Sequence, residues 1–297
     1  MQRIEFSLFK SFFEKDLTGN EIDFIITLSQ YQNDRGEVCA MHYKEMMEQT
    51  GMVAQSFYNC KQSLQEKGVI RVTRGENDYD ITLIGNDFSG YTDEDYSTGN
   101  VRYISTNKKL FSDANWKKLK PKQKLLAMDL LNICTAGNRT YRIGREKFIE
   151  KYADGMNPDG SRREGLLHVT ERTLQKYLKM LKLYFYIGLK DGTYYITLRS
   201  HFAKRNTECE KDATYRRLIK ASCRRDRIQE QPEKEVGGIL KLLNAYNEKL
   251  IRQFVYIPDL FHRMLEVINI KVADTRKWKR YLKKTLFHKL LNEAVAA

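Results

Sequence analysis

Residues 18–83 decide the fold, and they read TGNEIDFIITLSQYQNDRGEVCAMHYKEMMEQTGMVAQSFYNCKQSLQEKGVIRVTRGENDYDITL. Thr18 and Glu21 have the spacing of a capping box, in which each side chain binds the other residue's backbone N–H, and this predicts a helix from Ile22 to Tyr31. Gly51 and Gly68 mark the ends of two further helices. The other predicted elements are a strand at 37–40, these two helices at 41–49 and 53–67, and the two strands of a hairpin at 69–72 and 79–83. The order is therefore helix, strand, helix, helix, hairpin.

Residues 116–198 repeat that order. The predicted elements are a helix after Pro121, a strand, two helices and two strands, at residues 122–133, 140–143, 144–152, 171–183, 184–187 and 193–198. The last strand of the first repeat, YDITL at 79–83, matches YYITL at 194–198 in the same place. Asp191-Gly192 predicts a tight hairpin turn.

The third helix of the first repeat has two chemically different faces. Phe57, Cys60 and Leu64 share one face at helical spacing and should pack inward. The opposite face carries short polar and amide side chains of the kind that bind base edges in a major groove. The alternative is an ordinary solvated helix face. The candidate DNA contacts here are Gln55, Ser56, Tyr58, Asn59, Lys61 and Gln62.

Basic residues supply further candidate contacts. Arg71 and Arg74 lie on the first hairpin, where they are expected to contact phosphates. The third helix of the second repeat carries its own set: Arg172, Thr173, Gln175, Lys176 and Lys179. Residues 153–168 form an insertion with Arg162 and Arg163, which is either a basic loop that orders on DNA or a surface insertion without a role.

Composition narrows the class of partner. The formal net charge is +14 over 297 residues, which favours nucleic acid first and an anionic membrane surface second. No apolar run approaches the roughly 20 residues of a membrane span, and the first residues do not have the pattern of a signal peptide. Five separated cysteines without a CxxC pair are typical of the reducing cytoplasm.

The sequence lacks the usual patterns of catalytic sites. It contains no phosphate-binding GxxxxGK[ST] loop, no HExxH zinc motif and no GxSxG nucleophile elbow. Its five histidines are isolated, without metal-ligand spacing. We therefore expect neither an enzyme nor a bound metal or cofactor.

The rest of the chain is predicted from composition. Residues 199–227 are a basic stretch, helical from about 212, and residues 229–238 suggest a hinge because they contain a proline and two glycines. Helices are expected at 239–255, 258–270 and 275–294, where they would pack on the body, form a homodimer, bind a protein partner or contact DNA. The expected domains are 1–85, a linker at 86–100, 101–200, a basic segment with the hinge at 201–238, and 239–297.

These patterns resemble the winged helix-turn-helix superfamily twice, at Thr18–Leu83 and at about Trp116–Leu198. The resemblance implies a mainly α protein with small β-hairpins (α+β), two tandem winged-helix domains and a helical C-terminal region. It also implies sequence-specific binding of double-stranded DNA without catalysis. Tandem winged helices with a basic extension are similar to replication initiators of bacterial plasmids and phages, and single ones to bacterial transcription regulators. A regulator is our first expectation and an initiator the second; a protein that uses its winged helices to bind another protein is the third.

Overall fold

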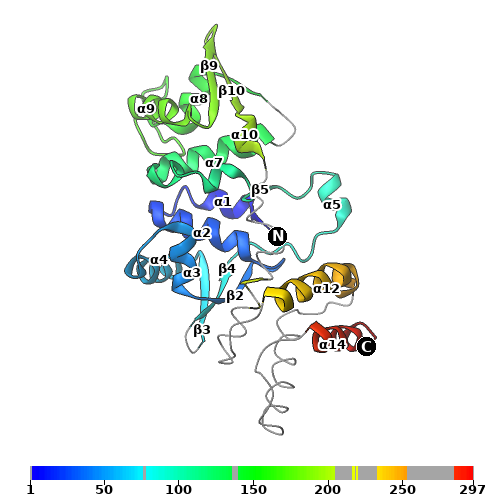
Figure 1. The fold of residues 1–297 in the computed structure, drawn as a ribbon. Coiled ribbons are helices and arrows are strands. Elements are labelled where there is room, and N and C mark those ends of the chain that lie inside the picture. The colour runs from blue at the N-terminus through cyan, green and yellow to red at the C-terminus, as the bar shows by residue number, and fades with distance from the viewer. Residues whose placement is uncertain are drawn as a thin grey trace. The chain divides into compact units, whose positions relative to one another are not determined.

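A computed structural model describes residues 2–75, 78–135, 140–204, 216, 217, 219, 233–252 and 284–296 (Figure 1). The described chain is mixed α and β with small antiparallel sheets, as predicted. It divides into two compact units. Unit 1 contains residues 1–37, 43–71 and 82–209, and unit 2 contains residues 38–42, 72–81 and 210–297.

The N-terminal segment contains a short strand followed by a helix. Strand β1 (Arg3–Glu5) pairs antiparallel with β5 (Tyr103–Ser105), and helix α1 (Phe6–Ser11) follows directly. The Glu5 carboxylate caps α1 by accepting from the backbone N–H groups of Ser7 and Leu8. Phe9 and Phe12 are buried, so this segment forms part of the core of unit 1.

The first repeat has the predicted element order. Its elements are α2 (Gly19–Tyr31), β2 (Glu37–Met41), α3 (Tyr43–Thr50), α4 (Ala54–Glu66), β3 (Ile70–Arg74) and β4 (Tyr79–Leu83). The strands form a sheet in the order β2-β4-β3. The capping box at Thr18 and Glu21 is confirmed, with both of its hydrogen bonds present. Helix α3 begins two residues later than predicted because Met41 belongs to the strand.

The second repeat has the same order and the same sheet topology. Its elements are α7 (Pro121–Thr135), β6 (Tyr141–Gly144), α8 (Arg145–Tyr152), α9 (Glu171–Leu181), β9 (Phe185–Lys190) and β10 (Thr193–Leu198). The sheet order is β6-β10-β9. Asp191 and Gly192 both have positive φ, 47° and 68°, which confirms the tight turn between β9 and β10.

Equivalent backbone hydrogen bonds close the two hairpins. Ile84 N donates to Val69 O at 3.0 Å in the first repeat, and Arg199 N donates to Tyr184 O at 2.9 Å in the second. This pairs Val69 with Tyr184 and Ile84 with Arg199, in register with the matching strands found in the sequence. The internal repeat therefore extends to local geometry.

Residues 86–100 contain more structure than the predicted linker. Helix α5 (Asp93–Ser97) has its own capping box, and α6 (Lys109–Ser112) and the 3-10 turn η1 (Trp116–Lys118) follow β5. The buried Arg3 guanidinium lies 4.3 Å from the ring centroid of Phe88 and 4.2 Å from that of Tyr96. Asn86, which is also buried, donates to Arg3 O at 3.1 Å. The polar composition of residues 86–100 did not predict these aromatic contacts, which hold the segment against β1.

The insertion at 153–168 is a folded hairpin. Strands β7 (Gly155–Met156) and β8 (Arg162–Arg163) pair antiparallel. Asp154 Oδ1 accepts from Gly165 N at 3.0 Å. A Cβ atom at Gly165 would lie 2.3 Å from Ala153 N, so a side chain there would clash with backbone. The insertion thus has a defined conformation in the absence of DNA, and both of its predicted roles stay open.

Two long helices of unit 2 correct the predicted hinge. Helix α12 (Glu233–Arg252) runs through Gly237 and Gly238, so the described part of residues 229–238 is helical. A Cβ atom at Gly238 would lie 2.8 Å from Lys284 Cδ, so glycine permits the close approach of α14 (Lys284–Ala296). Tyr246 on α12 donates to Asn292 Oδ1 on α14 at 2.6 Å. Packing of α12 on α14 is therefore one role of these helices.

Some predicted elements lie outside the described residues. They are most of the basic stretch at 199–227, the helix at 258–270 and the first part of the helix at 275–294. Within unit 1 the basic stretch begins with α10 (Ser200–Ala203). In unit 2 the buried Arg217 donates to Cys39 O at 2.6 Å.

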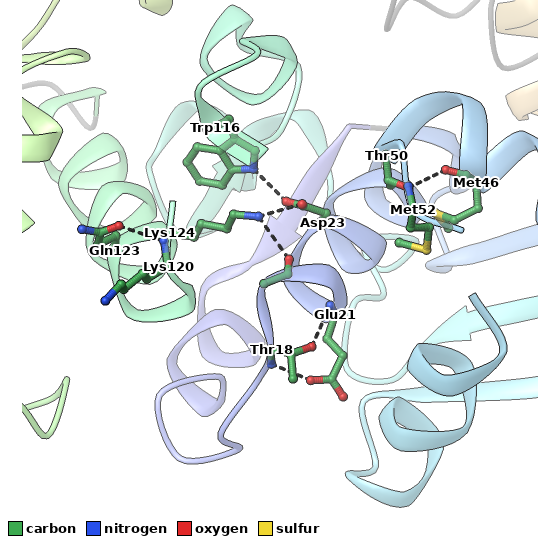
Figure 2. A network of polar contacts seen from close by, with 11 residues as sticks. Thr18, Glu21, Asp23, Met46, Thr50, Met52, Trp116, Lys120, Gln123 and Lys124 are labelled. Atoms are coloured by element: carbon green, nitrogen blue, oxygen red, sulfur yellow. Dashed lines mark hydrogen bonds and ion pairs between the residues drawn. The ribbon is translucent and has the colours of Figure 1, made fainter. Parts of the chain in front are cut away.

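A buried polar cluster joins the two repeats inside unit 1. The Lys124 side chain on α7 is 1% exposed, and its Nζ lies 2.6 Å from Asp23 Oδ2 on α2. The same ammonium group donates to Gly19 O at 3.1 Å, and Trp116 Nε1 donates to Asp23 Oδ1 at 2.9 Å. Figure 2 shows the bonds from Lys124 and Trp116 meeting at the Asp23 carboxylate. We call Asp23, Trp116 and Lys124 the junction.

Burial dominates the ionisation of the junction. It raises the pKa of Asp23 above its ordinary value, although Lys124 and Trp116 act in the opposite direction. It lowers the pKa of Lys124, although Asp23 opposes that shift. A buried pair of this kind contributes little net stability but fixes geometry, because each charge needs the other in place. The junction therefore disfavours any arrangement of α2 and α7 that separates Asp23 from Lys124.

The capping box of α2 also predicts a pH effect. Burial raises the pKa of Glu21, but hydrogen bonds from Ser63, Thr18 and Lys67 outweigh it and hold the pKa below the ordinary 4.5. A lowered pKa contributes stability above pH 4.5 that is lost as pH falls further. Glu21→Gln should therefore lower the free energy of unfolding at pH 7 by about 1–3 kcal/mol and flatten its fall below pH 4.5.

Urea denaturation of the full-length protein at several pH values measures this effect. Asp95→Asn is the matched control, because Asp95 occupies the same place in the exposed capping box of α5. Its effect on stability at pH 7 should be smaller. Parallel pH profiles for wild type and Glu21→Gln would contradict the role given to Glu21.

Candidate nucleic-acid interface

A three-residue turn sets the angle between α3 and α4. Thr50 Oγ1 donates to Met46 O at 2.6 Å and accepts from Met52 N at 3.2 Å (Figure 2). Gly51 between them has φ +74°, a conformation that side chains disfavour. Helix α4 then begins after Val53, whose side chain is exposed. The turn thus presents α4 with its apolar side inward.

Helix α4 is amphipathic as predicted. Phe57, Cys60 and Leu64 are buried, and burial raises the pKa of the Cys60 thiol to about 11. The candidate contacts lie away from this core: Gln55, Tyr58, Asn59 and Gln62 are exposed, and Ser56 and Lys61 are half-buried. The sequence and the structure agree on which side of α4 faces outward.

Local contacts order the outer face of α4. Gln55 Nε2 donates to Asn59 Oδ1 at 2.9 Å. This bond between side chains one helical turn apart fixes the orientation of the Asn59 amide group. The ring of Tyr58 lies 6.1 Å from that of Tyr43 on α3. Lys67, the C-cap residue of α4, pairs with Glu21 at 2.9 Å. The amide-rich face is therefore partly preorganised, and Lys67 serves the internal structure.

Helix α9 presents a basic stripe. Its N-cap Thr170 accepts from Thr173 N, and Leu174, Tyr177, Leu178 and Leu181 are buried. Arg172, Lys176 and Lys179 are exposed and follow i, i+4, i+7 spacing, so they share one side of the helix. None of the three forms an ion pair with any residue that the structure describes. We call these three residues the α9 stripe.

The other two candidates on α9 are engaged inside the repeat. Gln175 is half-buried and donates to the hydroxyl of Tyr194 on β10 at 3.0 Å. Thr173 is half-buried and bonds through its hydroxyl to that of Thr170 at 3.1 Å. Their role in DNA contact stays a prediction, whereas the α9 stripe points to solvent.

The arginines outside these helices differ in availability. Arg71 and Arg74 are exposed on β3, and Arg162 is exposed on β8. Arg163 is half-buried, and its guanidinium lies 3.8 Å from Glu150 Oε1 and against Gly155. Arg163 therefore stabilises the β7–β8 hairpin, and Arg162 is the more available cation of the insertion.

The structure adds residues that sequence reasoning missed. The junction brings Asp23 and Lys124 together across 101 positions of the chain. The only sequence signal was a lysine directly before the apolar run that begins at Leu125. In the view of Figure 1, α4 and α9 lie on the same side of unit 1, with α2 and α7 between them. The junction thus connects the helices that support the two candidate DNA-contacting faces.

We also considered whether the described helices could span a membrane and whether the chain is similar to known proteins. Among the described helices, none combines the length and the apolar character needed to cross a membrane. A comparison of the sequence and structure with protein-family profiles, curated proteins and solved structures found no match.

Proposed function

We propose that this chain is a sequence-specific double-stranded DNA-binding protein with two winged helix-turn-helix domains. The observation that carries the proposal is the repeated arrangement in which an amphipathic third helix, α4 or α9, follows a turn or loop and precedes a hairpin. In each repeat that helix turns a polar or basic face outward. A net charge of +14 favours a polyanionic partner.

Helices α4 and α9 have different roles in this proposal. On α4 the exposed amides of Gln55, Asn59 and Gln62 suit base edges, because an amide donates and accepts at once. The α9 stripe is suited to contacts with phosphates. Such contacts position a protein on the duplex but do not distinguish one base sequence from another. The first repeat therefore supplies most of the discrimination and the second most of the electrostatic affinity.

Transcription regulation in a bacterium is the first role that we propose. The alternative is initiation of replication on a plasmid, phage or other mobile element. The junction is the observation that favours this alternative. Because Asp23 and Lys124 join two non-identical repeats, one chain offers two different helices to the DNA. Such a chain suits an asymmetric site that can recur as direct repeats, whereas a symmetric dimer suits a palindrome.

Capture of fragmented DNA from the source cell on the full-length protein, followed by sequencing, tests the proposal and separates the two roles. Isolated sites that overlap promoters would support regulation. Clustered direct repeats would support initiation. Retention of all fragments alike would contradict sequence-specific binding.

Replacement of Asn59 by alanine should reduce discrimination between the captured site and random duplex DNA by about 1–3 kcal/mol, because the variant lacks a side-chain amide to read a base. Competition binding at fixed salt measures it. Gln65→Ala is the matched control, since Gln65 is exposed on α4 but lies six residues on and faces another direction. An equal loss of affinity for both DNAs would show that Asn59 does not read a base.

A further inference from the structure

The outer face of the β6-β10-β9 sheet carries two exposed tyrosines. Successive residues of a strand point to opposite faces, and β10 alternates buried Tyr194 and Ile196 with outward-facing Tyr195 and Thr197. Tyr186 on β9 lies opposite Thr197 and is 59% exposed, while Tyr195 is 37% exposed. The two rings therefore share one face of the sheet, and both are exposed.

Arginines accompany both rings. The Arg142 guanidinium lies 5.7 Å from the ring centroid of Tyr195, its direct partner across the β6–β10 pair. The Arg199 guanidinium lies 4.3 Å from the centroid of Tyr186 and is held there by donation to Lys182 O at 3.1 Å. These contacts position positive charge beside aromatic surface.

The neighbours of the rings leave the face open. Gly188 stands opposite Tyr195 on β9, so no side chain covers that ring from this strand. Lys190 stands opposite Thr193 and adds a third cation near the turn. Among the described strand residues that share this face, none is acidic. The face is therefore aromatic and basic.

The first repeat shows that the fold does not require these tyrosines. Alignment of the two hairpins places Arg71 at the position of Tyr186 and Asp80 at that of Tyr195. Asp80 Oδ1 accepts from Ala40 N at 2.7 Å, so it serves the backbone of its own sheet. The aromatic face is therefore specific to the second repeat.

We propose that this outer face, formed around Tyr186 and Tyr195, binds single-stranded DNA by base stacking. Unpaired bases expose the flat surfaces that aromatic rings stack on, whereas paired bases in a duplex are already stacked on each other. The three cations would contact the phosphates between the bases. This activity is additional to duplex binding and does not depend on α4 or the α9 stripe.

Fluorescence anisotropy of a labelled oligothymidine of about 16 nucleotides with the full-length protein tests the proposal. The wild type should bind, and Tyr186→Ala with Tyr195→Ala should weaken binding by about 25-fold or more, because each ring stacks one base. The corresponding double Tyr→Phe variant should bind like the wild type, since phenylalanine keeps the stacking surface. Affinity for duplex DNA should stay unchanged in both variants.

Leu189→Ala is the matched control, because Leu189 is also exposed on β9 but lies opposite Tyr194 and so on the other face. It should leave oligothymidine binding unchanged. Absence of wild-type binding, or full binding by the double alanine variant with an unaltered melting curve, would overturn the proposal. An equal loss of duplex affinity would also overturn it, by assigning the face to duplex contact.

Discussion

Replacing Lys124 with alanine should lower the free energy of unfolding of the full-length protein by about 3–5 kcal/mol. The change removes the only cation that pairs with Asp23 among the contacts described at the junction. Asp23 is 11% exposed, so its carboxylate would stay buried without its ion-pair partner, with only the weaker influence of the Lys117 charge left. A loss of this size is a large part of the 5–15 kcal/mol that stabilises a typical domain.

A double variant separates the charge from the packing. Asp23→Asn with Lys124→Met removes both charges, keeps an oxygen that can accept from Trp116 Nε1, and fills most of the lysine volume. It should regain most of the stability lost in Lys124→Ala, because replacement of a buried pair by neutral groups is often nearly neutral. Chemical denaturation of the three proteins measures the difference.

A surface pair provides the comparison for this prediction. Arg145 and Glu171 form an ion pair in which each side chain is 45% exposed. Arg145→Met should change stability by less than about 1 kcal/mol, since solvent screens an exposed pair. A similar loss in Lys124→Ala and Arg145→Met would contradict the structural role of the junction.

Removal of the α9 stripe should have the largest effect on DNA binding. The triple variant Arg172→Ala, Lys176→Ala and Lys179→Ala should lower duplex affinity by about 500-fold at 0.1 M salt, relative to wild type, if each residue neutralises one phosphate. The slope of log affinity against log salt should become shallower by about 2.7, because each contact adds roughly 0.9. Titrations of one labelled duplex over a salt series measure both quantities.

The control carries the same change in charge at other sites. Lys10, Lys118 and Lys204 are exposed on other parts of unit 1. Their triple alanine variant should retain most of the wild-type slope, because long-range attraction is screened beyond about 10 Å at 0.1 M salt. Equal slopes for the two triple variants would show that bulk charge, and not the α9 stripe, attracts DNA.

Local signals predicted much of the fold. The box at Thr18 and Glu21, the stop at Gly51 and the turn at Asp191-Gly192 act within a few residues, so sequence alone places them. The same reasoning identified the outward side of α4 from the spacing of its core. It also located the repeat, because matching strands stood in matching places.

The features that the sequence did not predict depend on contacts between residues far apart in the chain. Asp23 and Lys124 meet only because α2 and α7 pack together, and nothing near either residue announces the partner. Gly237 and Gly238 resemble helix breakers, yet α12 continues through them where Lys284 approaches Gly238 closely. On α9, Gln175 was indistinguishable from an outward amide until the structure placed it beside Tyr194.

Selection from a random duplex DNA pool tests the central claim most directly. The full-length wild type and its Asn59→Ala variant would each be put through rounds of binding and sequencing at fixed salt. The account predicts one enriched, asymmetric sequence for the wild type and reduced preference at one or a few positions for the variant. A pool that stays random after selection, although the protein retains DNA at low salt, would contradict sequence-specific recognition by α4.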